Sequence, residues 1–124
     1  MLTMLMIKKN TLEYKVTREG ATEPAFSGKY NTNSKKGMYL CINCKQKLFD
    51  SKDKFDSGTG WPSFHSIANK NSIKEKKDLS YGMIRTEVKC NNCNSHLGHV
   101  FSDGPAPTGL RYCINSVALL FNEK

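Results

Sequence analysis

Two short cysteine pairs, far apart in the chain, most limit what this sequence can fold into. Cys41 and Cys44 form one Cys-x-x-Cys pair and Cys90 and Cys93 form the other, with 45 residues between the pairs. Four thiolates at this spacing are the ligand set of a closed, tetrahedral structural zinc site. The separation exceeds the roughly 15–20 residues of a compact zinc ribbon, so a shared metal would join two distant segments. We therefore predict one structural Zn²⁺ bound by all four.

Two other interpretations of these cysteines fit the sequence less well. One pair could be a thioredoxin-like redox motif, but no β-α-β pattern surrounds either pair. His96 and His99 follow Cys93 closely and suggest a Cys-Cys-His-His finger, but the interval leaves no room for the hairpin and helix that a finger needs. The two histidines are therefore free for another role, although each could also be a structural histidine.

The fifth cysteine, Cys113, has no neighbouring cysteine to account for it. It lies in an apolar, β-forming run from 111 to 121 that follows a Pro-Thr-Gly turn and predicts a strand. Alternation along a strand would place Arg111, Cys113 and Asn115 on one face. The guanidinium favours the nucleophilic thiolate, and the Asn115 amide can donate to an oxygen. The alternative is that Cys113 is a small buried core residue, which the adjacent charge of Arg111 disfavours.

A second unusual segment carries the only tryptophan of the chain, Trp61. Gly58 and Gly60 permit a tight backbone bend, and Pro62 restricts the residue before it. A rigid aromatic ring of this kind is a good platform for a sulfur-bearing group. The alternative, that Trp61 is simply a core anchor, stays open at this point.

The charge and composition limit the classes of function that this chain can have. The formal net charge is +8, but the 16 lysines are scattered along the chain. Nucleic-acid readers usually cluster their basic residues, so we expect no nucleic-acid partner and ascribe the charge to solubility. No run is long enough to span a membrane, and the apolar residues 1–7 precede rather than follow their lysines, unlike a secretory signal. We expect a cytoplasmic protein without a membrane partner.

The remaining pattern predicts one mainly β, antiparallel domain, with short runs separated by Gly, Pro, Asn and Asp. Residues 10–19 predict a short helix capped by Asn10 or Thr11 and closed by Gly20. The lysine-rich segment 70–77 is interpreted as a solvated connection. The predicted strands are residues 38–42, 82–88, 96–101 and 110–121, the last with a possible break.

Several of these segments together resemble one family, the B-type methionine sulfoxide reductases. The resemblance runs from about residue 14 to 121, leaving 1–10 as a variable N-terminal segment and 11–124 as a single reductase domain. The matching motifs are residues 58–64 (GTGWPSF), 85–88 (RTEV), 96–105 (HLGHVFSDGP), 107–116 (PTGLRYCINS) and both cysteine pairs.

The resemblance implies a β-tent-like fold of two antiparallel sheets, with short N-terminal helices and a Cys₄ zinc site. It also implies reduction of the R epimer of methionine sulfoxide, mainly in oxidised proteins; the S epimer needs a different enzyme. By the family's pattern Cys113 is the nucleophile, and His99 with His96 holds and protonates the sulfoxide oxygen. Trp61 would receive the methyl group of the substrate, with Phe101 completing the pocket. The catalytic residue Arg111, with the substrate-binding residues Asp103 and Asn115, would orient and polarise these groups.

The chain departs from the family at one position. Many members carry a resolving cysteine in the middle of the Gly-x-Gly-Trp-Pro motif, where this chain has Thr59. We therefore predict a monomeric one-cysteine enzyme whose sulfenic acid is cleared by thioredoxin, glutaredoxin or a small thiol. The rival hypothesis is a non-catalytic zinc-stapled β module that binds a ligand at Trp61. Such a module would not need Cys113 together with two histidines.

Overall fold

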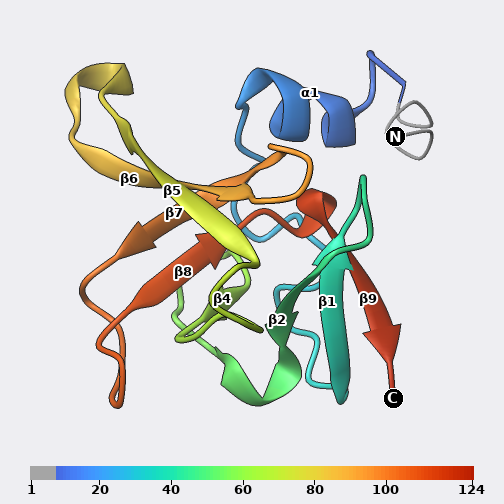
Figure 1. Ribbon diagram of the computed structural model, residues 1–124, viewed down its shortest axis with the longest axis vertical. Coiled ribbons are helices and arrows are strands. Elements are labelled where there is room, and N and C mark those ends of the chain that lie inside the picture. The colour runs from blue at the N-terminus through green and yellow to red at the C-terminus, as the bar shows by residue number, and fades with distance from the viewer. Residues whose placement is uncertain (1–7) are drawn as a thin grey trace.

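Two antiparallel sheets form the body of the protein in a computed structural model that describes residues 8–124 (Figure 1). The three-stranded sheet has the order β2-β1-β9, and the six-stranded sheet has the order β3-β4-β8-β7-β6-β5. The mainly β class and the two antiparallel sheets predicted from sequence are confirmed. The strands are β1 (Gly37–Cys41), β2 (Lys47–Asp50), β3 (Lys54–Phe55), β4 (Ser63–Phe64), β5 (Ile73–Asp78), β6 (Arg85–Cys90), β7 (His96–Phe101), β8 (Arg111–Ile114) and β9 (Leu119–Glu123).

The hydrophobic core includes a cluster of aromatic side chains from strands of both sheets. Along β1 every second residue is buried, as expected for a strand with one face on a core. Tyr39 of β1 meets Phe64 of β4 edge to face, with ring centroids 5.1 Å apart. Phe49 of β2 stacks on the same Phe64 ring at 4.4 Å. These contacts fix the two sheets against each other and hold β8, whose Tyr112 also packs on Phe49.

One α-helix, α1 (Leu12–Glu19), lies near the predicted place. The Thr11 hydroxyl caps it by accepting a hydrogen bond from the Tyr14 amide, and Gly20 ends it in the left-handed conformation. The other helical elements within residues 8–124 are three-residue 3₁₀ turns, so α1 stands where several short helices were expected. No helix in this range is both long and apolar enough to cross a membrane. The apolar segment 1–7 discussed above lies outside the described residues.

The break expected in the segment 110–121 separates two strands that belong to different sheets. β8 lies in the six-stranded sheet and β9 in the three-stranded sheet, and the 3₁₀ turn η4 (Ser116–Ala118) joins them. Asn115 and Ser116 form this corner with their side chains, which accept hydrogen bonds from the Glu23 and Tyr30 amides. The chain therefore changes sheets directly after the strand that carries Cys113.

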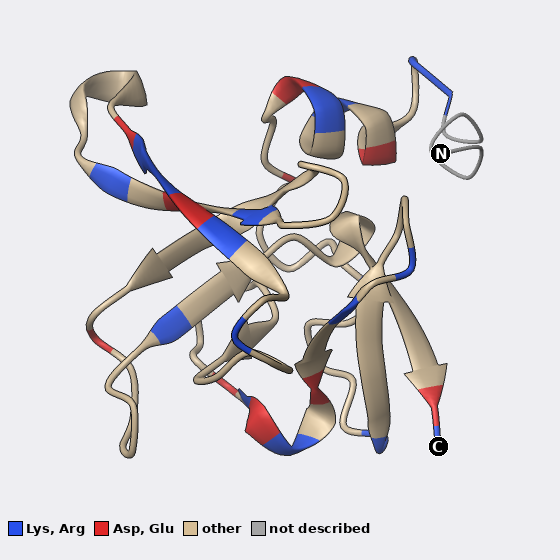
Figure 2. Ribbon diagram, viewed as in Figure 1, with Lys and Arg blue, Asp and Glu red and all other residues tan. Residues whose placement is uncertain are grey.

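The interpretation of residues 70–77 as a connection is wrong from Ile73 onward, because residues 73–77 belong to β5. β5 is an edge strand that pairs only with β6, and four consecutive residues in it are exposed. Exposure on both faces removes the alternation of apolar and polar residues that marks a strand in sequence, and charged side chains are common on such edges. Figure 2 shows the mixed charges along it. The next strand begins at Arg85, later than predicted, because Gly82 belongs to the 3₁₀ turn η3 (Ser80–Gly82).

Candidate active site and metal centre

The two cysteine pairs form matching turns at the ends of strands from different sheets. β1 ends at Cys41 and β6 ends at Cys90. In each turn an amide donates back to the carbonyl of the first cysteine, from Lys45 at 2.9 Å and from Asn94 at 2.8 Å. Both donors have positive φ, 68° and 67°. The backbone of each turn thus directs two thiols toward the same space.

The four sulfur atoms lie within 4.8 Å of one another. Cys41 and Cys93 are 3.6 Å apart between sulfurs, and Cys44 and Cys90 are also 3.6 Å apart. Tetrahedral ligands at the usual Zn–S distance of about 2.3 Å would be separated by about 3.8 Å. Contacts with the Cys41 and Cys93 sulfurs raise the pKa of Cys90, because neighbouring thiolates repel one another. The cluster is therefore suited to a four-coordinate metal ion that would join the two sheets.

A separate small pocket of about 110 Å³ gathers the residues predicted to carry chemistry. Five of the predicted site residues line it: Cys113, His99, Trp61, Phe101 and Asn115. A larger hollow of about 370 Å³ lies between segments 31–35 and 51–56, but it is lined by neither cysteine nor histidine. We assign the candidate site to the smaller pocket because a thiol and an imidazole meet only there among the described hollows.

The pairing of β7 with β8 sets Cys113 directly opposite His99. Gly98 permits this close pairing, since a Cβ atom there would collide with the Cys113 carbonyl oxygen. A thiol and an imidazole on paired positions of neighbouring strands lie within reach of one bound group. The sheet itself, rather than a loop, therefore positions the two reactive side chains.

The electrostatic environment of Cys113 differs from the expectation that Arg111 makes it a thiolate. Burial is the largest influence and raises the pKa of the Cys113 thiol, although Arg111 and a hydrogen bond with Thr59 lower it. Arg111 is also committed elsewhere: it donates to Asp103 at 2.9 and 3.1 Å and lies over the Phe101 ring, 4.4 Å from the centroid. Arg111 thus acts in the predicted direction, but desolvation outweighs it.

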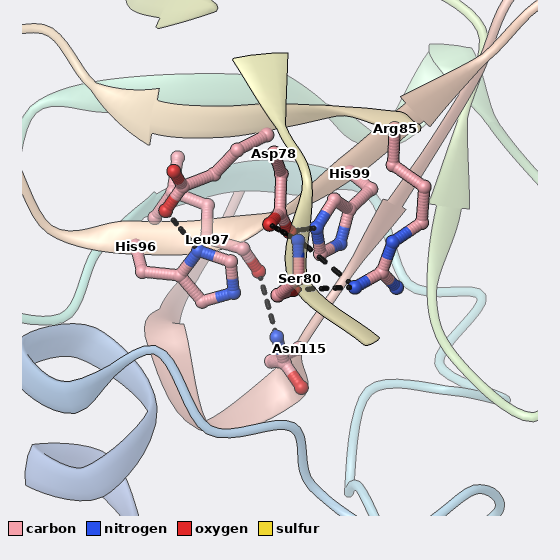
Figure 3. A network of polar contacts seen from close by, with 8 residues as sticks. Asp78, Ser80, Arg85, His96, Leu97, His99 and Asn115 are labelled. Atoms are coloured by element: carbon pink, nitrogen blue, oxygen red, sulfur yellow. Dashed lines mark hydrogen bonds and ion pairs between the residues drawn. The ribbon is translucent and has the colours of Figure 1, made fainter. Parts of the chain in front are cut away.

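His99 belongs to a polar network that the sequence did not reveal. Its Nε2 lies 2.8 Å from an Asp78 carboxylate oxygen, and Arg85 donates to the same oxygen at 3.3 Å (Figure 3). The hydrogen bond with His99, together with bonds from Ser80, lowers the pKa of Asp78. A carboxylate in this position orients the ring.

His96 has its own carboxylate partner and does not line the pocket. Its Nδ1 donates to Glu87 at 2.6 Å, and its ring lies edge to face with that of His99 at 5.5 Å between centroids. Burial lowers the pKa of His96 although Glu87 opposes this effect. Nε2 is buried and has no hydrogen-bond partner within residues 8–124.

A buried residue of the preceding loop, Glu23, anchors two walls of the pocket. Its carbonyl accepts from Trp61 Nε1 at 3.0 Å, and its amide donates to Asn115 Oδ1 at 2.9 Å. Asn115 in turn donates to the Leu97 carbonyl at 2.9 Å, which leaves one N–H of its amide for another acceptor (Figure 3). Both walls are therefore held rigidly against the strands.

The residues that line the pocket therefore differ in part from the predicted site residues. Arg111, Asp103 and His96 surround the pocket without lining it, whereas Thr22, Gly98 and Arg85 line it and were given no role from sequence. Arg85 and Glu87 stood within a family-like motif that could have drawn attention to them. Asp78 had no such signal, because it lies in none of the matching motifs and in none of the predicted strands.

Known proteins resemble this chain over most of its length. Residues 10–123 match the SelR domain family. A peptide methionine sulfoxide reductase MsrB of Pseudomonas fluorescens (strain Pf0-1) is 62% identical over 107 residues, covering 86% of this chain and 82% of the relative. The MsrB of Herminiimonas arsenicoxydans is 59% identical over 89% of this chain and 80% of the relative. The MsrB of Synechococcus sp. (strain RCC307) is 55% identical over 90% of this chain and 82% of the relative.

Proposed function

We propose that this chain, which belongs to the SelR domain family of B-type methionine sulfoxide reductases, uses Cys113 to reduce the R epimer of methionine sulfoxide, mainly in proteins. Membership makes the protein an oxidoreductase that acts on sulfoxides. The observation that supports the residue assignment is the pocket in which Cys113 and His99 face each other beside Trp61 and Phe101.

The first step forms a bond to the Cys113 sulfur while the sulfoxide S–O bond breaks. The thiolate bonds to the substrate sulfur while His99 transfers a proton to the oxygen. The resulting hydroxyl then moves to the Cys113 sulfur as its bond to the substrate sulfur and the new sulfur–sulfur bond both break, and methionine leaves as the thioether with the freed electron pair. The oxygen stays on Cys113 as a sulfenic acid, so the cysteine is oxidised and methionine sulfoxide is reduced. Asp78 orients the His99 ring through the contact to its Nε2.

The apolar part of the pocket would receive the methyl group of the substrate. Trp61, anchored on Glu23, and Phe101, covered by Arg111, provide the rings that favour sulfur and methyl contacts. The second amide hydrogen of Asn115 is available to the sulfoxide oxygen. Asp103 is assigned to holding Arg111 rather than to touching substrate, because the two form a bidentate pair.

The metal centre is proposed to hold one structural Zn²⁺, with Cys41, Cys44, Cys90 and Cys93 as ligands. A closed all-thiolate set has no open position for substrate, which is the arrangement of structural rather than catalytic zinc. Its contribution would be to hold β1 and β6 together, and none of the steps above involves it.

Regeneration is proposed to need an external thiol, because Thr59 stands where a resolving cysteine would be. A first thiol attacks the Cys113 sulfenic acid and releases water, leaving a mixed disulfide. A second thiol then reduces that disulfide and restores Cys113. Thioredoxin or a small thiol would serve, and a reducing compartment such as the cytoplasm supplies both.

The test is mass spectrometry of the protein after one turnover without reductant. We expect Cys113 as a sulfenic acid, trapped by dimedone, with the four remaining cysteines unmodified. A disulfide between Cys113 and another cysteine of the same chain would contradict the one-cysteine cycle. Reaction of the S epimer under the same conditions provides the control, since it should leave Cys113 as a thiol.

A further inference from the structure

Large apolar side chains that are exposed to solvent gather at two places in the described part of the chain. Six such side chains occur within residues 8–124, and five of them lie either in the hairpin tip 79–84 or at Phe26. The sixth, Leu12, lies on α1. The exposed residues of the tip are Leu79, Tyr81, Met83 and Ile84. Single exposed apolar residues are normal on a protein surface, whereas a group of them marks a place where something binds.

The hairpin tip begins and ends next to two residues of the polar network around His99. Asp78 and Arg85 pair across β5 and β6, and the tip joins them. Arg85 lines the pocket, and Asp78 lies 2.8 Å from His99 (Figure 3). The same two side chains hold the tip through Ser80, whose amide donates to Asp78 at 3.0 Å and whose hydroxyl accepts from Arg85 at 3.4 Å. The exposed side chains of the tip are therefore anchored at one edge of the pocket.

Phe26 lies at another edge of the pocket, beside Trp61. Its amide donates to the Gly60 carbonyl at 2.8 Å, and its ring is so close to Gly60 that a Cβ atom there would lie 2.8 Å from a ring carbon. Trp61, the next residue, lines the pocket. Trp61 precedes β4 and Arg85 begins β6, and these strands lie on opposite sides of the β8–β7 pair. Two apolar edges therefore flank the strands that carry Cys113 and His99.

The backbone holds both exposed aromatic residues in a conformation that bulky side chains rarely adopt. Phe26 has a φ of 65° and Tyr81 has a φ of 57°. The other non-glycine residues with positive φ in the described chain are Lys45 and Asn94 of the metal turns. A left-handed backbone is unfavourable for a bulky residue, and such strain clusters at functional sites. Burial does not offset it here, because Phe26 is 70% and Tyr81 88% exposed.

We propose that Phe26 and the tip 79–84 form an apolar rim, which binds the apolar residues that flank methionine sulfoxide in a polypeptide substrate. The inference rests on the proposed function and adds the sequence context that the site favours. A pocket of about 110 Å³ accommodates one side chain, so the rest of the polypeptide must pass over the edges. Methionine is an apolar residue with apolar neighbours in protein cores, and its oxidation disrupts those cores. The rim therefore selects the neighbours by polarity rather than by a particular sequence.

The experiment compares two blocked, uncharged pentapeptides with R methionine sulfoxide at the centre and dithiothreitol as reductant. Phenylalanine and leucine flank the sulfoxide in the apolar peptide, and two serines flank it in the polar peptide. Partial burial of two apolar side chains should lower KM about tenfold for the apolar peptide. The value of kcat should be similar for both peptides, because the rim contacts bound substrate and transition state alike.

Two variants and a matched control test the residues of the rim. Phe26→Asn and Tyr81→Asn remove the rings, and asparagine tolerates a left-handed backbone. Each change should reduce the KM advantage of the apolar peptide by about threefold, and the two effects should multiply in the double variant. Leu12→Asn is the control, because Leu12 is exposed but lies on α1, and the full advantage should persist. Misfolding lowers turnover of both peptides alike, so it leaves their ratio unchanged.

Equal KM values for the two peptides in the unmodified protein would overturn the inference, as would an undiminished advantage in the double variant. A second measurement does not depend on turnover: the fluorescence of Trp61, the only tryptophan, reports binding of each peptide to Cys113→Ser. Tighter binding of the apolar peptide, without turnover of either peptide by the unmodified protein, would reject the proposed function and keep the rim. Turnover of both peptides with equal KM would keep the proposed function and reject the rim.

Discussion

Replacing Cys113 by serine is expected to reduce turnover by about 10⁴-fold or more, the scale seen when an enzyme loses its nucleophile. A serine hydroxyl is far less acidic than a thiol and cannot carry the sulfoxide oxygen as a sulfenic acid. Cys113 lies on the pocket wall and is only partly buried, whereas the neighbouring Tyr112 and Ile114 face the core. The fold and metal site should therefore be unaffected.

The measurement is dithiothreitol-supported turnover, taken together with metal content and a melting curve of the same preparation. Cys113→Ala is the companion variant, since it removes the hydroxyl as well and should show the same loss. Turnover of either variant within about tenfold of the unmodified protein would exclude Cys113 as the nucleophile. A loss of turnover accompanied by loss of metal would point instead to misfolding.

Removal of the metal is expected to unfold the protein rather than merely reduce its turnover rate. Structural zinc sites supply about 10–16 kcal/mol in small metal-dependent domains, as much as the whole stability of a typical domain, about 5–15 kcal/mol. Here the four cysteines join β1 and β6, which belong to different sheets. Hydrogen bonds such as that from Asn43 to Ser95 at 2.8 Å also join the two turns, but each such bond is worth only about 0.5–1.5 kcal/mol.

Circular dichroism during titration with a strong chelator is the measurement, and Cys41→Ser is the matched variant. Cys41 is fully buried, so its serine variant should lose both metal and cooperative melting. Cys113→Ser should respond to the chelator as the unmodified protein does, which separates the metal centre from the pocket. A melting temperature unchanged after complete removal of the metal would show that the centre is not structural.

The sequence predicted best those parts of the fold whose signals are local. The sequence alone predicted the two cysteine pairs, the helix caps at Thr11 and Gly20, and β7 over residues 96–101. β3 and β4 have only two residues each, too few for any periodicity to appear. β5 was missed because an exposed edge strand has no buried face to mark it, and the 3₁₀ turn that starts at Ser80 delayed the start of β6.

In the candidate site, likewise, pairs of residues that meet only through tertiary packing could not be predicted from the sequence. Proximity in sequence correctly suggested an effect of Arg111 on Cys113, but not the burial that outweighs it. The partnership of His99 with Asp78 joins residues 21 positions apart through two strand pairings, so it could not be read from spacing. The anchoring of Trp61 on Glu23 depends likewise on a loop that folds back over the sheet.

The central claim is tested most directly by turnover of separated R and S epimers of methionine sulfoxide in a blocked, peptide-like substrate, with dithiothreitol as reductant. Reduction of one epimer alone is expected, because a single pocket with Cys113 on one wall and the Trp61 ring on another accepts one arrangement of methyl, oxygen and lone pair. The proposed function predicts that this epimer is R. Reduction of neither epimer by folded, metal-loaded protein with a free Cys113 thiol would contradict the account, and so would equal reduction of both.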